Sequence, residues 1–527
     1  MAATAIALAA VARMAWPGPG LAFVALVPWL SVLDRGVSLR RSVATGWLLA
    51  VAMQALIFRW FGDGLADYAG APRILGLIAI LALAPLLQPQ LVLFAWARGL
   101  LGRLPVRWPL PVMAIASASL YVGSEWAVPK LFGDSLGHGL YASLSMRQGA
   151  QIAGVPGLTF VLLIANEFAL AAARAFARPS GIRDRLFAVA PPAAVAIGLG
   201  VSLSAYGAVR LAQLERASGV GPSETVRIAI IQADISHYGR LREELGPYDA
   251  VRKILDTHFA LSHEALARGP LDLIVWPETV YPTTFGTPKS EDGADLDREI
   301  AAFVMATGVP LIFGAFDAAD AAEFNAAIVL EPDPETSGRV AFDAYHKARL
   351  FPLTERAPGF IEHTPLRALF HWVGNWQPGD GARAMDVDLP GGRRLRIAPL
   401  ICYDAVDPAL AMDAVRQGAE LIVTLSNDSW FASGAGPGLH SMIAAFRSIE
   451  TRRPQIRSTT TGISAVMDVS GTQRASLGVH ETGILVEDVP IVRGAQRPSD
   501  VPARALGPIC AAVGALSVGW AVRGFRR

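Results

Sequence analysis

The chain has 527 residues, of which 52% are hydrophobic and 17% are charged, and its mean hydropathy is +0.39. This composition is more apolar than that of an ordinary soluble protein, so we expect part of the chain to lie in a membrane. A net charge of +1, with no basic stripe carrying interleaved aromatic residues, argues against nucleic acid as a partner, and two cysteines exclude a disulfide scaffold and a cysteine-rich zinc site.

The N-terminal part of the chain consists of apolar segments separated by short connectors that carry arginine. Segments of about 20 apolar residues fit the hydrocarbon core of a bilayer, which is roughly 30 Å thick. We therefore predict a membrane domain over 1–206 with about seven spans, and one C-terminal span within 504–527. The N-terminal spans are predicted over 2–16, 19–33, 43–59, 74–95, 109–128, 151–173 and 186–206, and the first two are short.

The arginines of the connectors predict which ends of the spans face the cytoplasm. Arginine-rich connectors follow the second, fourth and sixth predicted spans, and arginines also close the chain, whereas the other connectors carry fewer arginines mixed with aspartates. The positive-inside rule places the arginine-rich set in the cytoplasm. The long segment 207–503 is then predicted to lie on the opposite side of the membrane.

Segment 207–503 has the pattern of a soluble α/β domain. Short β-rich runs alternate with helical stretches, and no repeat of fixed period is present. Interleaved strands and helices of this kind predict an α/β sandwich. Strands are predicted over 226–234, 271–276, 310–316, 325–330, 395–402, 421–426 and 463–469, and helices over 248–267, 295–306, 407–417 and 438–452.

The apolar strand that begins at Leu271 ends in the sequence Trp276-Pro277-Glu278. Pro277 forces the chain out of the sheet, and a carboxylate that is partly desolvated at the end of a strand is a stronger base than one in water. Glu278 is therefore a candidate general base. The alternative at this point is a solvated turn residue.

Lys347 begins a second candidate segment, in which Glu355 follows eight residues later. A lysine beside a cleft stabilises an oxyanion through its fixed positive charge, and it favours the ionised form of a nearby thiol. Lys347 is a candidate for both roles. The alternative is a surface lysine that pairs with Glu355.

Cys402 closes the apolar run 395–401, and polar Asp404 follows two places later. Side chains at the carboxyl end of a core strand often point into a ligand crevice. The segment 207–503 contains no second cysteine, so Cys402 has no disulfide partner within its own domain. Cys402 is a candidate nucleophile, and the alternative is a small buried hydrophobic residue.

The chain order Glu278, Lys347, Cys402 resembles that of the nitrilase superfamily of carbon–nitrogen hydrolases, whose triad is Glu, Lys and Cys. The sequences Trp-Pro-Glu at 276–278, Ile-Cys-Tyr at 401–403 and Ser-Asn-Asp-Ser-Trp-Phe at 426–431 are close to the pattern. Within this superfamily, several N-terminal spans, one exported domain and one C-terminal span resemble the apolipoprotein N-acyltransferase family over nearly the whole chain.

This resemblance implies a nitrilase-like α-β-β-α sandwich in 207–503, on the periplasmic side of a bacterial inner membrane. It implies that Glu278 deprotonates Cys402, that the thiolate attacks the sn-1 ester of a phospholipid, and that Lys347 stabilises the oxyanion. The acyl chain then passes from a thioester on Cys402 to the α-amine of the diacylglyceryl-cysteine that begins an apolipoprotein. The implied partners are a phospholipid acyl donor, a diacylated apolipoprotein acceptor and the membrane.

The resemblance also assigns supporting roles. Glu355 matches a second glutamate that orients the lysine or shares a proton with it, and Tyr403 is a candidate backbone donor to the oxyanion. Asp404 matches a residue beside the nucleophile, and Trp276 belongs to the motif of the general base. No cofactor is implied. No metal is implied either, since the nine histidines show no His-x-x-x-His spacing near carboxylates.

Several positions depart from the family's pattern. Asp404 replaces a glutamate, Thr460 and Thr461 replace two asparagines, and Ala432 replaces a glycine. Because the triad is intact, we expect acyl transfer with an altered preference for donor or acceptor. The alternatives are a membrane-tethered nitrilase-type amidase, a divergent relative that acylates another amine, and a transporter or sensor with an inactive exported domain.

Overall fold

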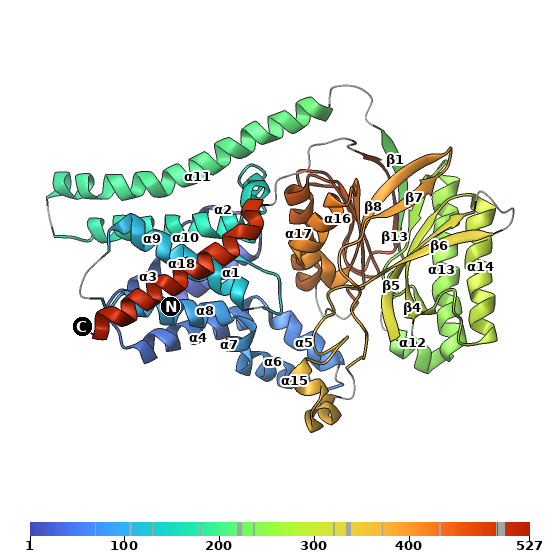
Figure 1. Ribbon diagram of the computed structural model, residues 1–527, viewed down its shortest axis with the longest axis horizontal. Helices are drawn as coiled ribbons and strands as arrows, with labels where there is room; N and C mark the ends of the chain where they lie inside the picture. Colours follow the sequence, from blue (N-terminus) through green and yellow to red (C-terminus); the bar gives the residue numbers. More distant parts are fainter. Residues whose placement is uncertain are drawn as a thin grey trace. The chain divides into compact units, whose positions relative to one another are not determined.

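The computed structural model describes residues 1–68, 70–104, 108–128, 130–179, 181–218, 224–235, 238–319, 322–333, 339–370, 373–429, 431, 434–491, 493 and 501–526. The chain forms two compact units (Figure 1). The first unit consists of Met1–Val220 together with Pro498–Arg527, and the second is Gly221–Arg497.

The first unit is built from helices in the residues that the structure describes, drawn in blue to green with the C-terminal helix in red (Figure 1). The helices are α1 (Ala2–Ala12), α2 (Gly18–Leu21), α3 (Val27–Leu33), α4 (Leu39–Leu56), α5 (Arg59–Tyr68), α6 (Arg73–Ala82), α7 (Ala84–Leu87), α8 (Pro89–Leu101), α9 (Leu110–Ala127), η1 (Leu136–Leu140), η2 (Met146–Gly149), α10 (Ala150–Phe176), α11 (Ile182–Ser218) and α18 (Val501–Arg526).

Several of these helices have the length and composition of membrane spans. In the described part of the chain, Met146–Phe176, Ile182–Arg216 and Val501–Arg523 are each long and apolar enough to cross a bilayer. Leu39–Leu56 and Arg59–Asp67, which are bent by 64°, add a fourth crossing if the pair is one broken span. The first unit is thus a helical membrane domain, as expected from the composition, while the larger number of crossings given above stays a prediction.

The predicted span over 74–95 is not one helix but three. Helix α6 ends at Ala82, α7 carries Pro85 in its first turn, and α8 begins at Pro89. Proline has no N–H to donate to the preceding turn, so it is accommodated most easily where a helix begins. The two prolines therefore divide an apolar segment whose hydropathy alone indicates a single span.

The second unit contains two sheets and the helices that cover them. Its strands are β1 (Thr225–Gln232), β2 (Leu273–Val275), β3 (Tyr281–Thr284), β4 (Leu311–Ala319), β5 (Ala322–Pro332), β6 (Val340–His346), β7 (Met385–Leu389), β8 (Arg393–Ile401), β9 (Leu421–Ser426), β10 (Gln455–Thr459), β11 (Ser464–Met467), β12 (Gln473–Leu477) and β13 (Gly483–Pro490). Its helices are α12 (Tyr238–Leu245), α13 (Pro247–Ala267), α14 (Glu291–Thr307), α15 (Gly359–Glu362), η3 (Pro365–Phe370), η4 (Cys402–Val406), α16 (Pro408–Arg416) and α17 (Ala435–Thr451).

The two sheets have similar mixed topologies. The first has the strand order β13-β1-β2-β4-β5-β6, with β3 paired to β4, and the second has the order β12-β11-β10-β9-β8-β7. Strands β1, β2 and β4 run parallel to one another, and so do β8, β9 and β10. Parallel strands end at the same edge of a sheet, so the loops that follow them gather there.

The sheets pack face to face and their outer faces carry helices. One core joins the two sheets, with Ile228 and Leu273 from the first and Ile397 and Leu421 from the second. A second core lies between the first sheet and helices α13 and α14, and a third lies between the second sheet and α16. The unit is therefore an α-β-β-α sandwich, and the predicted fold class is confirmed.

Strand β8 illustrates why this fold follows from the sequence. Leu395 and Ile397 point into the core between the sheets, whereas Ala398 and Leu400 point toward α16. A strand that is buried on both faces reads as a continuous apolar run rather than as an alternating pattern. The run ends at Ile401, and the next residue is Cys402.

Candidate active site

The three residues of the predicted triad each follow a strand. Glu278 lies three residues after β2, Lys347 directly follows β6 in the same sheet, and Cys402 directly follows β8 in the other sheet. All three side chains are nearly excluded from water, with exposed fractions of 4%, 2% and 8% respectively. The site therefore lies at strand ends of both sheets rather than on the surface of either one.

The ammonium group of Lys347 lies between two carboxylates. Its Nζ donates to Oε1 of Glu278 at 3.1 Å and to Oε1 of Glu355 at 2.8 Å. Burial alone lowers the pKa of Lys347, but the negative charges of Glu278 and Glu355 outweigh that effect and raise the pKa well above its ordinary value. These contacts favour the charged form of Lys347, which lies between Glu278, the predicted general base, and Glu355, the residue predicted to orient the lysine.

Two asparagines that sequence reasoning missed complete the cluster. Nδ2 of Asn325, from β5, donates to Oε1 of Glu278 at 2.7 Å and to Oε1 of Glu355 at 3.2 Å. The backbone N–H of Asn427 donates to Oε2 of Glu278 at 2.6 Å. Both oxygens of Glu278 thus have donors, which fixes the orientation of its carboxylate.

Cys402 has an unusual backbone for a residue with a side chain. Its φ is +48°, in the left-handed region that residues other than glycine rarely adopt. Burial raises the pKa of the Cys402 thiol, the negative charge of Glu278 raises it further, and the positive charge of Lys347 partly opposes them. The surroundings of Cys402 therefore favour the protonated thiol over the thiolate, and the charges of Glu278 and Lys347 both act on the sulfur.

Asp404 connects the nucleophile's turn to the segment that carries Lys347. The donors to its carboxylate are the Tyr345 hydroxyl and the Ile401 N–H, both at 3.0 Å from Oδ2, and the N–H groups of Ala348 and Arg349, at 3.2 and 2.7 Å from Oδ1. Burial raises the pKa of Asp404 to about 6, although these donors oppose the rise. A carboxylate with four donors from both segments holds Cys402 and Lys347 in register.

Tyr403 and Trp276 are the other two residues predicted to support the site. Tyr403 is half-buried, and its ring packs edge-on against Phe351 with 5.1 Å between the ring centres. The Trp276 side chain is fully buried in the core beneath α13 and α14, where its Nε1–H donates to Ser262 at 2.9 Å. The structure therefore gives Trp276 a packing role and does not bring its ring to the Glu278–Lys347–Cys402 group.

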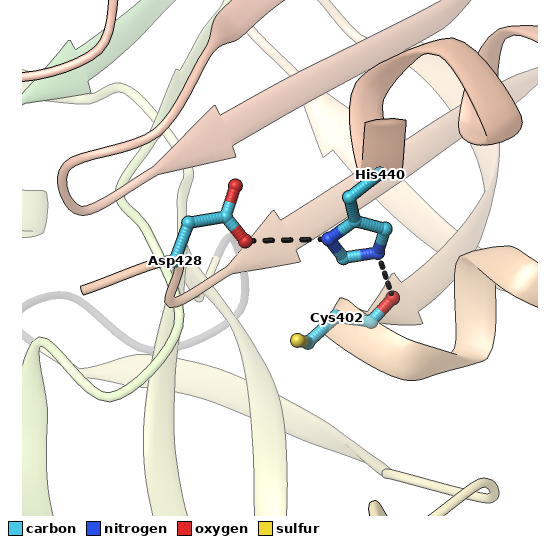
Figure 2. A group of neighbouring side chains, drawn as sticks. All are labelled: Cys402, Asp428 and His440. Carbon is cyan, nitrogen blue, oxygen red and sulfur yellow. Dashed lines mark hydrogen bonds and ion pairs between the residues drawn. The ribbon is translucent and has the colours of Figure 1, made fainter. Parts of the chain in front are cut away.

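A second buried group, which includes Asp428 and His440, contacts the backbone of Cys402, and sequence reasoning gave its residues no role. Figure 2 shows His440 between the Asp428 carboxylate and the Cys402 carbonyl, with the Cys402 sulfur on the opposite side of the residue from that oxygen. Nε2 of His440 lies 3.1 Å from the carbonyl oxygen, and Nδ1 lies 3.3 Å from Oδ1 of Asp428. Arg457, from β10, donates to Oδ2 of Asp428 at 2.9 Å.

Cys402, Asp428 and His440 are close enough to be considered as metal ligands. One ligand atom from each lies within 4.8 Å of the others. Arg457 argues against a cation there, because its guanidinium contacts both Asp428 and His440. The guanidinium already neutralises Asp428, whose pKa burial would raise but the charge of Arg457 holds below its usual range. This group is better explained as a structural network than as a metal centre.

Of the positions that depart from the family's pattern, Thr460 lies beside the site and Ala432 lies outside the described residues. The Thr460 hydroxyl donates to the Glu278 carbonyl at 3.5 Å. A Cβ atom at Gly462 would overlap the side chain of Asp428, so glycine is required there for close approach. The glycine that ends this motif thus makes room for the Asp428–His440–Arg457 group.

Comparisons with known proteins agree with this architecture. Residues 227–498 match the model of the carbon-nitrogen hydrolase family, and residues 3–167 match that of the apolipoprotein N-acyltransferase N-terminal domain. The apolipoprotein N-acyltransferase of Geobacter metallireducens is 29% identical over 496 residues, which cover 91% of this chain and 88% of the relative. That of Chlorobaculum tepidum is 26% identical over 505 residues, which cover 90% of this chain and 87% of the relative.

Among solved structures, an amidase from Nesterenkonia sp. aligns with 51% of this chain and 92% of its own, at 20% identity and a TM-score of 0.36. The match over 227–498 spans more than half of the sequence, so the chain belongs to the carbon–nitrogen hydrolase family. The N-terminal match and the relatives that cover nine tenths of the chain confirm the predicted resemblance to the apolipoprotein N-acyltransferase family.

Proposed function

We propose that this membrane enzyme transfers a fatty acyl chain from a phospholipid, through a thioester on Cys402, to the α-amine of the diacylglyceryl-cysteine of an apolipoprotein. The observation that carries the proposal is the buried cluster of Glu278, Lys347 and Glu355 beside the Cys402 thiol. A base, a fixed cation and a sulfur nucleophile are the groups that acyl transfer through a covalent intermediate requires.

The first half-reaction acylates the enzyme. As the Cys402 sulfur bonds to the sn-1 ester carbon, Glu278 takes the thiol proton and the carbonyl oxygen becomes an oxyanion stabilised by the Lys347 ammonium. The oxyanion then collapses, the bond from carbon to the glycerol oxygen breaks, and the leaving alkoxide takes the proton from Glu278. A lysophospholipid leaves, and an acyl thioester remains on Cys402.

The second half-reaction transfers the chain to nitrogen. The acceptor amine attacks the thioester carbon, Lys347 again faces the oxyanion, and Glu278 accepts a proton from the amine. When the carbon–sulfur bond breaks, the thiolate recovers this proton from Glu278, because burial raises the pKa of Cys402. The product is an amide, and the site returns to its resting protonation state.

Glu355 supports both steps without exchanging a proton itself. One oxygen holds Lys347, and the other accepts the N–H of Phe351 at 2.7 Å. With Glu355 as a second carboxylate, Lys347 keeps a counter-ion after Glu278 is protonated. Tyr403 is proposed to supply a backbone N–H to the oxyanion, with Asp404 holding that turn.

The domain order proposed from the sequence places this chemistry on the periplasmic side of the inner membrane. Residues 1–206 and 504–527 would carry the spans and residues 207–503 the catalytic domain, in agreement with the arginine pattern of the connectors. A cysteine introduced at exposed Glu264 should react with a membrane-impermeant maleimide in intact spheroplasts. Labelling only after lysis would place the domain in the cytoplasm instead.

The activity is tested by trapping the intermediate. The full-length protein in mixed micelles with phosphatidylethanolamine labelled in the sn-1 chain should acquire a hydroxylamine-labile label, and C402A should acquire none. A diacylated lipopeptide should then discharge the label as an amide. Release of ammonia from small amides, with no thioester from phospholipid, would instead identify a membrane-tethered amidase.

A further inference from the structure

The backbone of the nucleophile needs an external constraint. Cys402 has a φ of +48°, and a residue with a Cβ atom keeps such a conformation only where its surroundings determine it. Its side chain must remain free to react, so the constraint has to act on the backbone. The carbonyl group of Cys402 has a side-chain partner that can supply this constraint (Figure 2).

That partner is His440 of α17, which is 8% exposed. Its Nε2 lies 3.1 Å from the Cys402 carbonyl oxygen, which can only accept a hydrogen bond. Nε2 therefore carries a proton. Its Nδ1 lies 3.0 Å from a guanidinium nitrogen of Arg457, which can only donate. Oδ1 of Asp428 lies farther from Nδ1, at 3.3 Å, so the nearer guanidinium is the partner of Nδ1. In this arrangement the ring is neutral, with Nε2 as donor and Nδ1 as acceptor.

Arg457 keeps the ring in that state, and Asp428 in turn holds Arg457 in place. Both are fully buried, and Arg457 donates to Oδ2 of Asp428 at 2.9 Å, while the Ser426 hydroxyl donates to Oδ1 at 2.9 Å. Burial and the nearby charge of Arg457 lower the pKa of His440, although Asp428 opposes this effect. The neutral ring then has a single tautomer, the one that donates to Cys402.

The position of Asp428 is itself built into the fold. Asp428 follows β9 and Arg457 lies in the adjacent parallel strand β10, so the pair is fixed by strand register. Gly462 leaves the space that the Asp428 side chain occupies. The group therefore connects the second sheet, through α17, to the backbone of the nucleophile.

We propose that His440 is a positioning residue for the nucleophile: its Nε2–H holds the Cys402 carbonyl, and so holds the left-handed turn that directs the sulfur toward Glu278 and Lys347. Arg457, which is held by Asp428, fixes the tautomer that makes this bond. His440 touches no reacting atom and exchanges no proton. The inference rests on the proposed acyl transfer and adds to it a requirement on backbone geometry.

The test compares two substitutions of His440 in the full-length protein. H440M removes the donor with little change in volume, and H440Q keeps an N–H donor near the same place. With labelled phosphatidylethanolamine in mixed micelles, H440M should lower the saturating rate of thioester formation about 100-fold, since small misplacements of a nucleophile have effects of this order. The phospholipid concentration that gives half the saturating rate should change less than about threefold. The saturating rate of H440Q should exceed that of H440M at least about tenfold.

His258 provides a matched control. It is buried in α13 of the same unit, its Nδ1 lies 2.8 Å from the Ile254 carbonyl of its own helix, and it packs against Trp276 rather than the site. H258M should leave the rate per folded molecule unchanged, even where it lowers the thermal midpoint.

The outcomes separate the two proposals. Absence of any thioester in the wild type would overturn the proposed function and this inference with it. A wild-type thioester with an unchanged rate in H440M, an equal loss in H258M, or an H440Q variant as slow as H440M would each overturn the inference alone. A loss confined to the half-saturation concentration would also overturn it, because that would indicate a binding role.

Discussion

Replacing Lys347 with methionine tests the charge balance of the site. The Lys347 ammonium lies 3.1 Å from Glu278 and 2.8 Å from Glu355, and both carboxylates also accept from Asn325. K347M would leave two neighbouring carboxylates without a counter-ion. Breaking a buried ion pair from one side costs about 3–5 kcal/mol, so K347M should lose stability of this order at neutral pH. Its rate of thioester formation should fall at least about 10²–10³-fold, because the oxyanion loses its cation.

The double variant K347M/E355Q separates the two effects. Adding E355Q removes one negative charge together with the positive charge, so part of the lost stability should return. The rate should not return, since neither residue then faces the oxyanion with a positive charge. Thermal midpoints of the purified protein in detergent measure the first effect, and the hydroxylamine-labile label on Cys402 measures the second. Equal stability of K347M and wild type, or a further loss on adding E355Q, would refute the charge balance described above.

Three further changes follow from the same contacts. Burial raises the pKa of Asp404 from its ordinary 3.8 to about 6, so its protonated form stabilises the fold at low pH, and that stability, roughly 3 kcal/mol, is lost as pH rises through about 6. The thermal midpoint of D404N should lack this component of the pH dependence. Parallel plots of thermal midpoint against pH for D404N and the wild type would contradict this prediction. Because burial raises the pKa of Cys402, its alkylation by iodoacetamide should be slow at neutral pH and still rise with pH above about 9, whereas a plateau near pH 8 would show an ionised thiol. G462A should destabilise the protein by about 1–3 kcal/mol because the new Cβ meets Asp428, while G438A, whose Cβ would meet nothing closer than 3.8 Å, should not.

Sequence reasoning predicted best those strands in which every consecutive side chain is apolar or small and buried. Strand β9 has the predicted bounds, Leu421–Ser426, because every one of its side chains is buried and the whole run is apolar or small. The same reasoning placed Glu278 and Cys402 at strand ends, where apolar runs stop abruptly. Local pattern was sufficient there because each residue's environment is determined by its own strand.

Strand β10 was missed for the opposite reason. Gln455–Thr459 is fully buried but contains four polar or charged residues, some of which bond to distant partners. Gln455 donates to Thr424 at 2.8 Å, and Arg457 donates to Asp428. A polar sequence reads as exposed until those partners are known, and nothing near it in the chain identifies them.

The three residues of the triad were predicted from the sequence, whereas the residues that hold them in place, Asn325 and His440, were not. Glu278, Lys347 and Cys402 stand in recognisable motifs, whereas Asn325 and His440 look like ordinary polar residues of a strand and of an amphipathic helix. Asn325 is 47 residues from Glu278, and His440 is 38 residues from Cys402, so only the folded sheets bring them together. The one available signal was Asp428, in the segment that resembled the family's pattern.

The burial of the Cys402 thiol has a consequence for its resistance to oxidation. Peroxides and foreign disulfides attack the ionised, accessible form of a sulfur side chain, and this one is neither ionised nor open to bulk water. A nucleophile that is kept buried as a thiol is therefore expected to be oxidised slowly between turnovers. Isolation of the sulfur would thus protect the enzyme between turnovers as well as shape its reaction.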